Sequence, residues 1–200
     1  MPRTAVSAVY SPVMKTVHWT TVVLVIALLL IGWTMTSGFV MSRTALDALL
    51  GWHKSLGILV LFLTLFRIVW RGTHRPPALP PGLRPWEIVA VEVVHKLLYV
   101  LLVLQPVTGW CLSTLSPVKT RFFGSFFIPS LPFLSGFRYS PVAREALEGA
   151  HGFMAGLLAV LLVVHAGAAF KHHFMVRDDV LLRMAPARLG PALKKLRGER

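Results

Sequence analysis

The stretch HGFMAGLLAVLLVVH, residues 151–165, decides the fold of this chain. It begins and ends with histidine and lies within an uncharged run from Ala150 to Phe170. His151 and His165 are 14 residues apart (165 − 151). An α-helix turns about 100° and rises about 1.5 Å per residue, so the second imidazole returns to within about 40° of the first, about 21 Å along the axis. One apolar helix therefore presents two imidazoles on one face at two depths.

The composition indicates an integral membrane protein. Of its residues, 55% are hydrophobic and only 14% are charged, and several apolar runs can cross a hydrocarbon core of about 30 Å. A cleaved signal peptide is the alternative for the first run, but that run exceeds the usual length of about 7–15 residues. We predict an all-α membrane protein, a four-helix transmembrane bundle over 1–184 with helices at about 16–41, 50–71, 86–115 and 149–174, and a basic tail over 185–200.

Lysine and arginine are unequally distributed between the two ends of these helices. One end carries Arg3, Lys15, Arg67, Arg71, Arg75, Arg84, Lys96, Lys171, Arg177, Arg183, Arg188, Lys194, Lys195, Arg197 and Arg200. The other carries only Arg43, Lys54, Lys119, Arg121, Arg138 and Arg144. The positive-inside rule then places both termini in the cytoplasm. The net charge of +13 is also compatible with nucleic-acid binding, but a basic tail after a membrane helix is more typical of contact with anionic lipid, so we expect membrane lipid and no nucleic acid as partner.

Two connections between the helices differ in character. Residues 71–86, RGTHRPPALPPGLRPW, are rich in proline and predict a stiff cytoplasmic link. The external segment from about Ser116 to Glu148 contains RFFGSFFIPSLPFLSGF, which is apolar but interrupted by glycine and proline. Because it is too interrupted to span, we expect it to form a cap over the outer end of the bundle.

Four histidines form two pairs at matching depth. His18 and His165 lie toward the cytoplasmic side, whereas His53 and His151 lie toward the outer side. Imidazole is a good axial ligand for haem iron, and two histidines per iron are typical of a centre that passes electrons without binding substrate. The pattern predicts an inner haem on the first pair and an outer haem on the second. Cys111 is the single cysteine, so CxxCH attachment is excluded and both haems are expected to be non-covalent.

The 14-residue spacing recurs in three other places, where Gly32, Arg67 and Gly109 follow His18, His53 and His95. A glycine opposite a ring lets a porphyrin approach the backbone, although ordinary close helix packing is an equally good reason for small residues. Arg67 lies at the depth of the inner haem, where it can pair with a propionate. Zinc is the other common use of clustered histidines, but Asp and Glu co-ligands are almost absent near the two pairs.

Four segments together resemble the bacterial cytochrome b561 family. They are TVHWT at 16–20, GWHKSLGILVLFLTLFRIVWR at 51–71, VHKLLYVLLVLQPVTGW at 94–110 and GAHGFMAGLLAVLLVVHAGAAFKHHFMVRDDVLLRM at 149–184. The resemblance covers the chain from about Tyr10 to Met184. It implies a bacterial inner-membrane cytochrome with two b haems, ligated by residues that correspond to His18, His53, His151 and His165. It also implies electron exchange with ubiquinone and, for at least one member, superoxide oxidase activity on the periplasmic face.

The outer side carries a candidate funnel for the superoxide anion. Lys54, Lys119 and Arg121 can attract a small anion toward the outer haem, and the alternative is that they are solvated loop charges.

The cytoplasmic side carries candidate quinone contacts. Quinone reduction needs groups that bind carbonyl oxygens and deliver protons, and His95, His172 and His173 can do both. The alternative for His172 and His173 is a helix end in contact with lipid headgroups.

We therefore hypothesise a membrane-bound cytochrome that carries electrons from superoxide to ubiquinone. One alternative is a haem b electron-transfer subunit that links the quinone pool to a partner dehydrogenase or hydrogenase. An alternative of another class is a non-redox membrane carrier or structural bundle.

Overall fold

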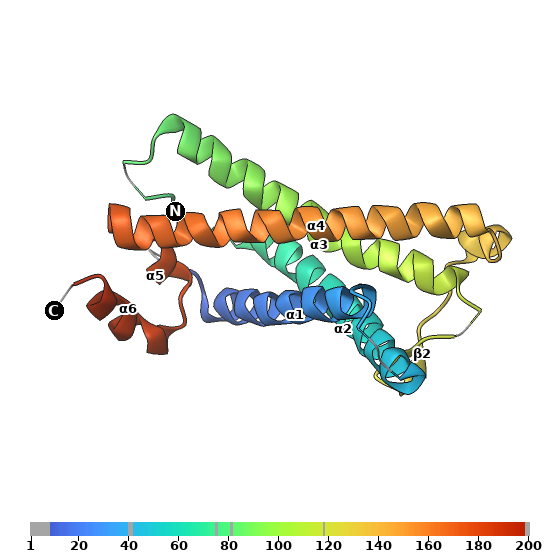
Figure 1. The fold of residues 1–200 in the computed structure, drawn as a ribbon. Helices are drawn as coiled ribbons and strands as arrows, with labels where there is room; N and C mark the ends of the chain where they lie inside the picture. Colours follow the sequence, from blue (N-terminus) through green and yellow to red (C-terminus); the bar gives the residue numbers. More distant parts are fainter. Residues whose placement is uncertain (1–8, 40–41, 75, 81, 118, 199–200) are drawn as a thin grey trace.

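Four long helices dominate the computed structural model, which describes residues 9–39, 42–74, 76–80, 82–117 and 119–198 (Figure 1). They are α1 (Pro12–Thr36), α2 (Arg43–Thr73), α3 (Pro85–Leu115) and α4 (Pro141–Lys171). Arg3, Arg75 and Arg200, which contributed to the predicted orientation, lie outside the described residues. Among the described residues, α1, α2 and the span from α4 to Val176 are long and apolar enough to cross a membrane. A mostly helical membrane protein is therefore confirmed, and three of the four predicted spans are among these candidates, whereas α3 is not.

Serine caps set the starts of three helices. The side chains of Ser11, Ser42 and Ser140 accept hydrogen bonds from backbone N–H groups in the first turns of α1, α2 and α4. Proline follows two of these caps directly, at Pro12 and Pro141, where its missing N–H costs nothing. The helices consequently begin 4, 7 and 8 residues before the predicted positions 16, 50 and 149. The prediction followed the onset of hydrophobicity, whereas the caps determine where the backbone becomes helical.

Each helix packs against the next one in the chain, α1 on α2, α2 on α3 and α3 on α4. The buried core at their centre consists of Val25, Val60, Leu98, Leu101 and Leu158. Three of these residues lie seven positions from a paired histidine of the same helix. Val25 follows His18 and Val60 follows His53 by seven residues, and Leu158 lies seven residues from both His151 and His165. At about 1.5 Å per residue, an apolar layer thus lies about 10 Å from each histidine level.

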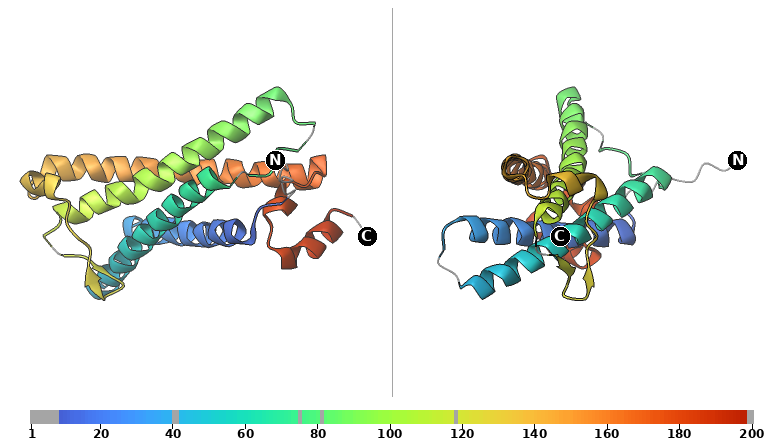
Figure 2. Two further views of the ribbon diagram at one scale, coloured as in Figure 1. Left: turned by 180° about the vertical axis from the view of Figure 1, so that it is seen from behind. Right: turned by 90° about the vertical axis from the view of Figure 1, so that its right-hand side faces the viewer.

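The external segment folds as a cap on the ends of α2 and α3. It contains a short hairpin, β1 (Arg121–Phe122) with β2 (Phe126–Phe127), and the 3-10 helix η1 (Pro132–Phe137). Ser55 of α2 accepts a 3.0 Å hydrogen bond from the Phe123 N–H, and Trp110 of α3 donates a 2.8 Å bond to the Pro129 carbonyl. Figure 2 shows the hairpin at the end of the molecule opposite α5 and α6.

The C-terminal residues fold back onto the other end of the bundle. They form the π-helix η2 (His172–Val176), α5 (Val180–Met184), the 3-10 helix η3 (Ala187–Leu189) and α6 (Gly190–Leu196). Trp19 of α1 donates its indole N–H to the Met184 carbonyl at 3.0 Å, which brings the first and last parts of the chain together. The Arg197 guanidinium donates to the Arg177 carbonyl at 3.2 Å. Within the predicted basic tail over 185–200, the described residues up to 198 therefore contain the short helices η3 and α6.

Candidate functional site

The two histidine pairs predicted from depth come together in space. The His18 and His165 rings, from α1 and α4, have centroids 6.4 Å apart and planes inclined at 72°. The His53 and His151 rings, from α2 and α4, have centroids 6.2 Å apart and planes inclined at 69°. All four side chains are half-buried. Helix α4 thus supplies one imidazole to each pair, as its 14-residue spacing requires.

Both separations fit one metal ion held between the rings. Two imidazoles that share a metal through bonds of about 2 Å, with each nitrogen about 1 Å from its ring centre, have centroids about 6 Å apart. The measured centroid separations are 6.4 Å and 6.2 Å. The donor set also fits, because pairs of neutral nitrogen ligands without carboxylates are typical of low-spin haem iron.

The two predicted glycines both face the outer pair. A Cβ atom on Gly109 of α3 would lie 3.2 Å from Cε1 of His151, and one on Gly32 of α1 would lie 3.5 Å from Cε1 of His53. The first distance is tighter than most real Cβ contacts, whereas the second is an ordinary contact. The backbones of α1 and α3 therefore approach the outer imidazoles closely, at positions where a side chain would take up the space.

Arg67 lies beside the inner pair, at the depth the sequence predicted. Its Nη1 donates to Nδ1 of His18 at 3.0 Å, and its guanidinium lies over the Tyr99 ring at 5.4 Å from the centroid. The Arg67 Nε is buried and has no acceptor among the described residues. A buried donor without a partner is costly, so this nitrogen fits an acceptor such as a haem propionate.

The three candidate quinone residues occupy three different environments. His95 contacts the inner pair, with its ring centroid 5.0 Å from that of His165 and its Nδ1–H donating to the Val91 carbonyl at 2.6 Å. His172 is buried at the helix end, where its Nδ1–H donates to Asp178 at 2.5 Å. His173 is 0% exposed and its Nε2–H donates to the Leu193 carbonyl of α6 at 3.1 Å, which leaves no ring atom accessible to a quinone.

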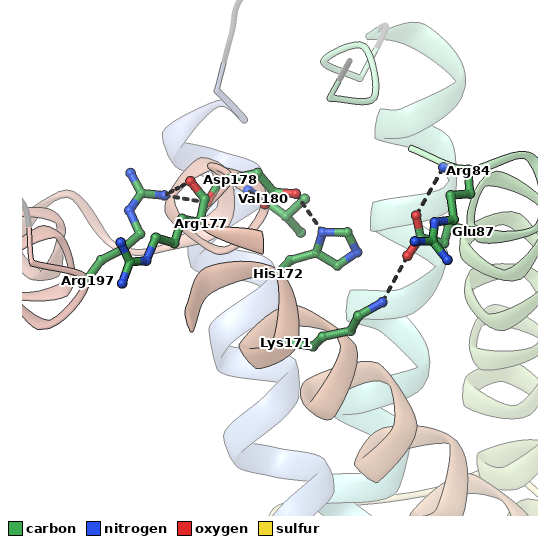
Figure 3. A network of polar contacts seen from close by, with 8 residues as sticks. All are labelled: Arg84, Glu87, Lys171, His172, Arg177, Asp178, Val180 and Arg197. Carbon is green, nitrogen blue, oxygen red and sulfur yellow. Dashed lines mark hydrogen bonds and ion pairs between the residues drawn. The ribbon is translucent and has the colours of Figure 1, made fainter. Parts of the chain in front are cut away.

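His172 belongs to a network of charged groups at the end of the molecule that carries α5 and α6 (Figure 3). Lys171 binds Glu87 of α3 at 2.9 Å, while Arg197 binds the carboxylate of Asp179 at 2.9 Å. Figure 3 shows the His172 ring between Asp178 on one side and the Glu87–Lys171 pair on the other. The network ties together the ends of α3 and α4 and the C-terminal segment.

The candidate anion-funnel residues gather at the cap. Lys54, next to the ligand candidate His53, donates from Nζ to the Thr120 hydroxyl at 2.9 Å. Thr120 lies between Lys119 and Arg121 in the chain, and both of these cations lie over the Phe127 ring, at 5.7 Å and 4.5 Å from its centroid. The three positive charges therefore share one end of the molecule with the outer histidine pair.

Sequence reasoning missed two polar residues of α3 that contact His151. The Thr108 hydroxyl lies 2.9 Å from Nδ1 of His151, and the Gln105 side-chain amide donates to the His151 carbonyl at 3.0 Å. A signal was present, because Gln105 directly follows the apolar stretch LLYVLLVL at 97–104 and precedes Pro106. Asp178, the partner of His172, was also missed, since it lies beyond the apolar run.

A sequence model of prokaryotic cytochrome b561 matches residues 9–187, which is almost the whole chain. The chain belongs to the prokaryotic cytochrome b561 family. It is 30% identical over 184 residues to cytochrome b561 homolog 2 of Escherichia coli strain K12, covering 88% of this chain and 90% of that protein. It is 28% identical over 136 residues to cytochrome b561 homolog 1 of the same organism, covering 68% and 74%. It is 26% identical over 183 residues to a probable superoxide oxidase CybB of Yersinia pestis, covering 90% and 98%.

Membership makes this cytochrome a bacterial membrane protein that binds haem b and transfers electrons. This agrees with the two imidazole pairs and with the apolar helices that carry them. It disfavours the non-redox carrier or structural bundle that the sequence alone left open.

Proposed function

We propose that this cytochrome holds two b haems, one on each imidazole pair, and carries electrons between the two sides of the bacterial inner membrane. The observation that carries this proposal is the placement of two facing pairs at two depths, with centroids 6.4 Å and 6.2 Å apart. When bound, haem supplies reversible one-electron chemistry. The protein supplies the ligands, an apolar layer between the two levels and polar groups at each end.

Four spans with both termini in the cytoplasm are the topology that best suits these pairs. Helix α3 has 31 residues, the same length as α2, and packs between α2 and α4. The end of the molecule that carries α5 and α6 also carries most of the lysine and arginine residues after α4. The positive-inside rule then assigns this end to the cytoplasm and the hairpin end to the periplasm.

The proposed donor at the periplasmic end is superoxide. A cluster of positive charge beside an electron acceptor raises the encounter rate of a small anion, and Lys54, Lys119 and Arg121 lie there with the outer pair. The similarity to the protein of Yersinia pestis named a probable superoxide oxidase supports this choice. With ubiquinone as acceptor, two superoxide anions, one quinone and two protons give two dioxygen molecules and one quinol.

The proposed quinone contacts lie at the cytoplasmic end. His95 touches the inner pair, and His172 is fixed by Asp178 so that its Nδ1 carries a proton. A histidine hydrogen-bonded to a carboxylate is suited to pass a proton, because the carboxylate holds the ring in one orientation and stabilises the protonated imidazole. His173 serves instead to hold α6 in place.

Haem content tests the ligand assignment. His18→Ala and His165→Ala should remove the same haem, and His53→Ala and His151→Ala should remove the other, because each iron needs both of its axial ligands. Haem per protein is measured by the pyridine haemochrome method, together with the optical spectrum after reduction. Loss of both haems in every variant, or of neither, contradicts the assignment.

An anaerobic superoxide pulse tests the activity. Haem reduction followed by reoxidation with a soluble ubiquinone is expected in the wild type. If the reduced haem bands never appear, superoxide is not the donor.

The second candidate function, an electron-transfer subunit for a partner enzyme, is favoured by the exposed aromatic side chains of the cap, such as Phe133 at 71% and Tyr139 at 82% exposure. It predicts co-purification with a large redox protein.

A further inference from the structure

Three nearby residues of α3, namely Gln105, Thr108 and Gly109, contact His151 on one side. The side-chain amide of Gln105 holds the His151 carbonyl at 3.0 Å, and the Thr108 hydroxyl lies 2.9 Å from the ring nitrogen Nδ1. Gly109 leaves the space beside Cε1 open, since a Cβ atom there would lie 3.2 Å from it. One helical turn of α3 thus contacts the backbone, the Nδ1 atom and the Cε1 edge of His151 and sets the orientation of its ring.

The direction of the Thr108 hydrogen bonds fixes the tautomer of His151. The hydroxyl lies 2.9 Å from the backbone carbonyl of Gln105 and also 2.9 Å from Nδ1 of His151. A carbonyl oxygen can only accept, so both contacts are hydrogen bonds only when the single hydroxyl proton goes to Gln105 and the hydroxyl oxygen accepts from Nδ1–H. The proton of a neutral imidazole is then on Nδ1, and Nε2 keeps the lone pair that an iron ligand needs.

The other ring nitrogens at the two sites have different surroundings. Nδ1 of His53, the other ligand candidate of the outer pair, is buried and has no partner among the described residues. Nδ1 of His18 in the inner pair faces the Arg67 guanidinium at 3.0 Å, which can only donate. For Nε2 of His18 to ligate iron its proton must lie on Nδ1, so Arg67 must then donate to another acceptor, such as a haem propionate. Among the described residues, Nδ1 of His151 therefore has a hydrogen-bond partner, Thr108, whereas Nδ1 of His53 has none.

We propose that Thr108 is a positioning residue that fixes the His151 ring and lowers the reduction potential of the outer haem. A hydrogen bond from Nδ1–H to an acceptor increases the electron density on the imidazole and makes it a stronger ligand. An imidazole with more imidazolate character stabilises ferric over ferrous iron, so the reduction potential of the haem falls. The inference rests on the proposed function only in requiring that His151 binds the outer iron.

Thr108→Val tests this, because valine has nearly the same shape but no acceptor. At a fixed potential near the midpoint, the ratio of reduced to oxidised outer haem should rise about three- to tenfold, a shift of about 30–60 mV for one electron. Potentiometric titration followed optically measures it, and the electron paramagnetic resonance signal of the ferric outer haem should change with it. The inner haem, identified from the His18→Ala and His151→Ala variants, should keep its potential.

Two further variants separate a hydrogen-bond effect from a packing effect. Thr108→Ser keeps the hydroxyl, so its outer potential should return close to the wild-type value. Thr34→Val makes the same chemical change on α1, where the hydroxyl donates to the Leu30 carbonyl at 2.7 Å and touches no histidine, and it should shift neither haem.

An unchanged outer potential in Thr108→Val overturns the inference, and so does an equal shift in Thr108→Ser. If His151→Ala retains both haems, the ligand assignment has failed instead, and that outcome is visible before any titration.

Discussion

The two outer imidazoles pack against glycines of neighbouring helices, and this limits the side-chain volume that the site accepts. The two contacts are unequal, because an added Cβ would meet His151 at 3.2 Å but His53 at 3.5 Å. A few tenths of an ångström matter in a packed interior, where overpacking costs about 1–3 kcal/mol. The two glycines, although related by the same spacing in the sequence, should therefore respond differently to substitution.

Gly109→Ala should lower the occupancy of the outer haem, since the new methyl group pushes against the His151 ring. Gly32→Ala should be close to neutral, because its contact with His53 is ordinary and alanine favours the helix by about 1 kcal/mol. Haem content per protein and the thermal unfolding midpoint measure both effects. Equal losses in the two variants would show that the glycines serve general packing rather than the fit to His151.

The two imidazole pairs could be predicted from single residues, but their hydrogen-bond partners could not. His151 and His165 share a helix, so their spacing alone fixed their relative position. Thr108 carries no such signal, because most threonines in apolar helices bond only the carbonyl of the preceding turn, as Thr34 does. That Thr108 also reaches His151 depends on the way α3 packs on α4.

At the scale of elements, hydrophobicity predicted the long helices and local capping decided their ends. The starts of α1, α2 and α4 follow Ser11, Ser42 and Ser140, which hydropathy does not register. The fold of the last residues was missed for a different reason. Arg197 looks like a solvent-exposed tail residue in sequence, yet its side chain is only 4% exposed and binds carbonyl groups of the turn after η2.

The turn after η2 matters because it returns Asp178 to His172. Arg177 adopts a left-handed backbone conformation with φ of 61°, which ends the π-helix and reverses the chain. The Asp178 carboxylate then accepts from His172 and, through its other oxygen, from the Val180 N–H at 3.0 Å. The turn thus holds the carboxylate in one orientation against the ring.

Asp178→Asn should slow quinone reduction about a hundredfold or more, the range typical of lost proton-transfer groups, without slowing haem reduction by superoxide. Stopped-flow measurement of the two half-reactions separates them. Asp179→Asn is the matched control, because it removes the neighbouring carboxylate, which binds Arg197 rather than His172. A similar loss in both variants would assign the effect to the stability of the turn.

In the whole molecule, the two ends differ in the charged residues that they carry. Lys54, Lys119 and Arg121 share the periplasmic end of the proposed topology with the outer pair, while the acidic partners Glu87, Asp178 and Asp179 lie with the cytoplasmic network. Exposed charges act over about one Debye length, which is about 10 Å at 0.1 M salt. Long-range attraction at the periplasmic end should therefore depend on ionic strength.

The rate of haem reduction by superoxide should fall as salt is raised from 0.01 M to 0.5 M, by a factor of about ten for a steered encounter. Haem reduction by a neutral chemical reductant should change little over the same range. Replacing Lys119 and Arg121 together by glutamine should flatten the salt dependence. A rate that is independent of salt in the wild type would show that the cations do not guide the anion.

The central cluster of Val25, Val60, Leu98, Leu101 and Leu158 has a bioenergetic consequence. It contains only hydrocarbon side chains, so none of its residues can relay a proton between the two histidine levels. In the proposed function, electrons that move inward through this cluster carry no proton with them, and the protons for the quinol are taken up from the inside. Detoxification outside would thus polarise the lipid barrier, negative within, and conserve part of the energy that dismutation in free solution dissipates as heat.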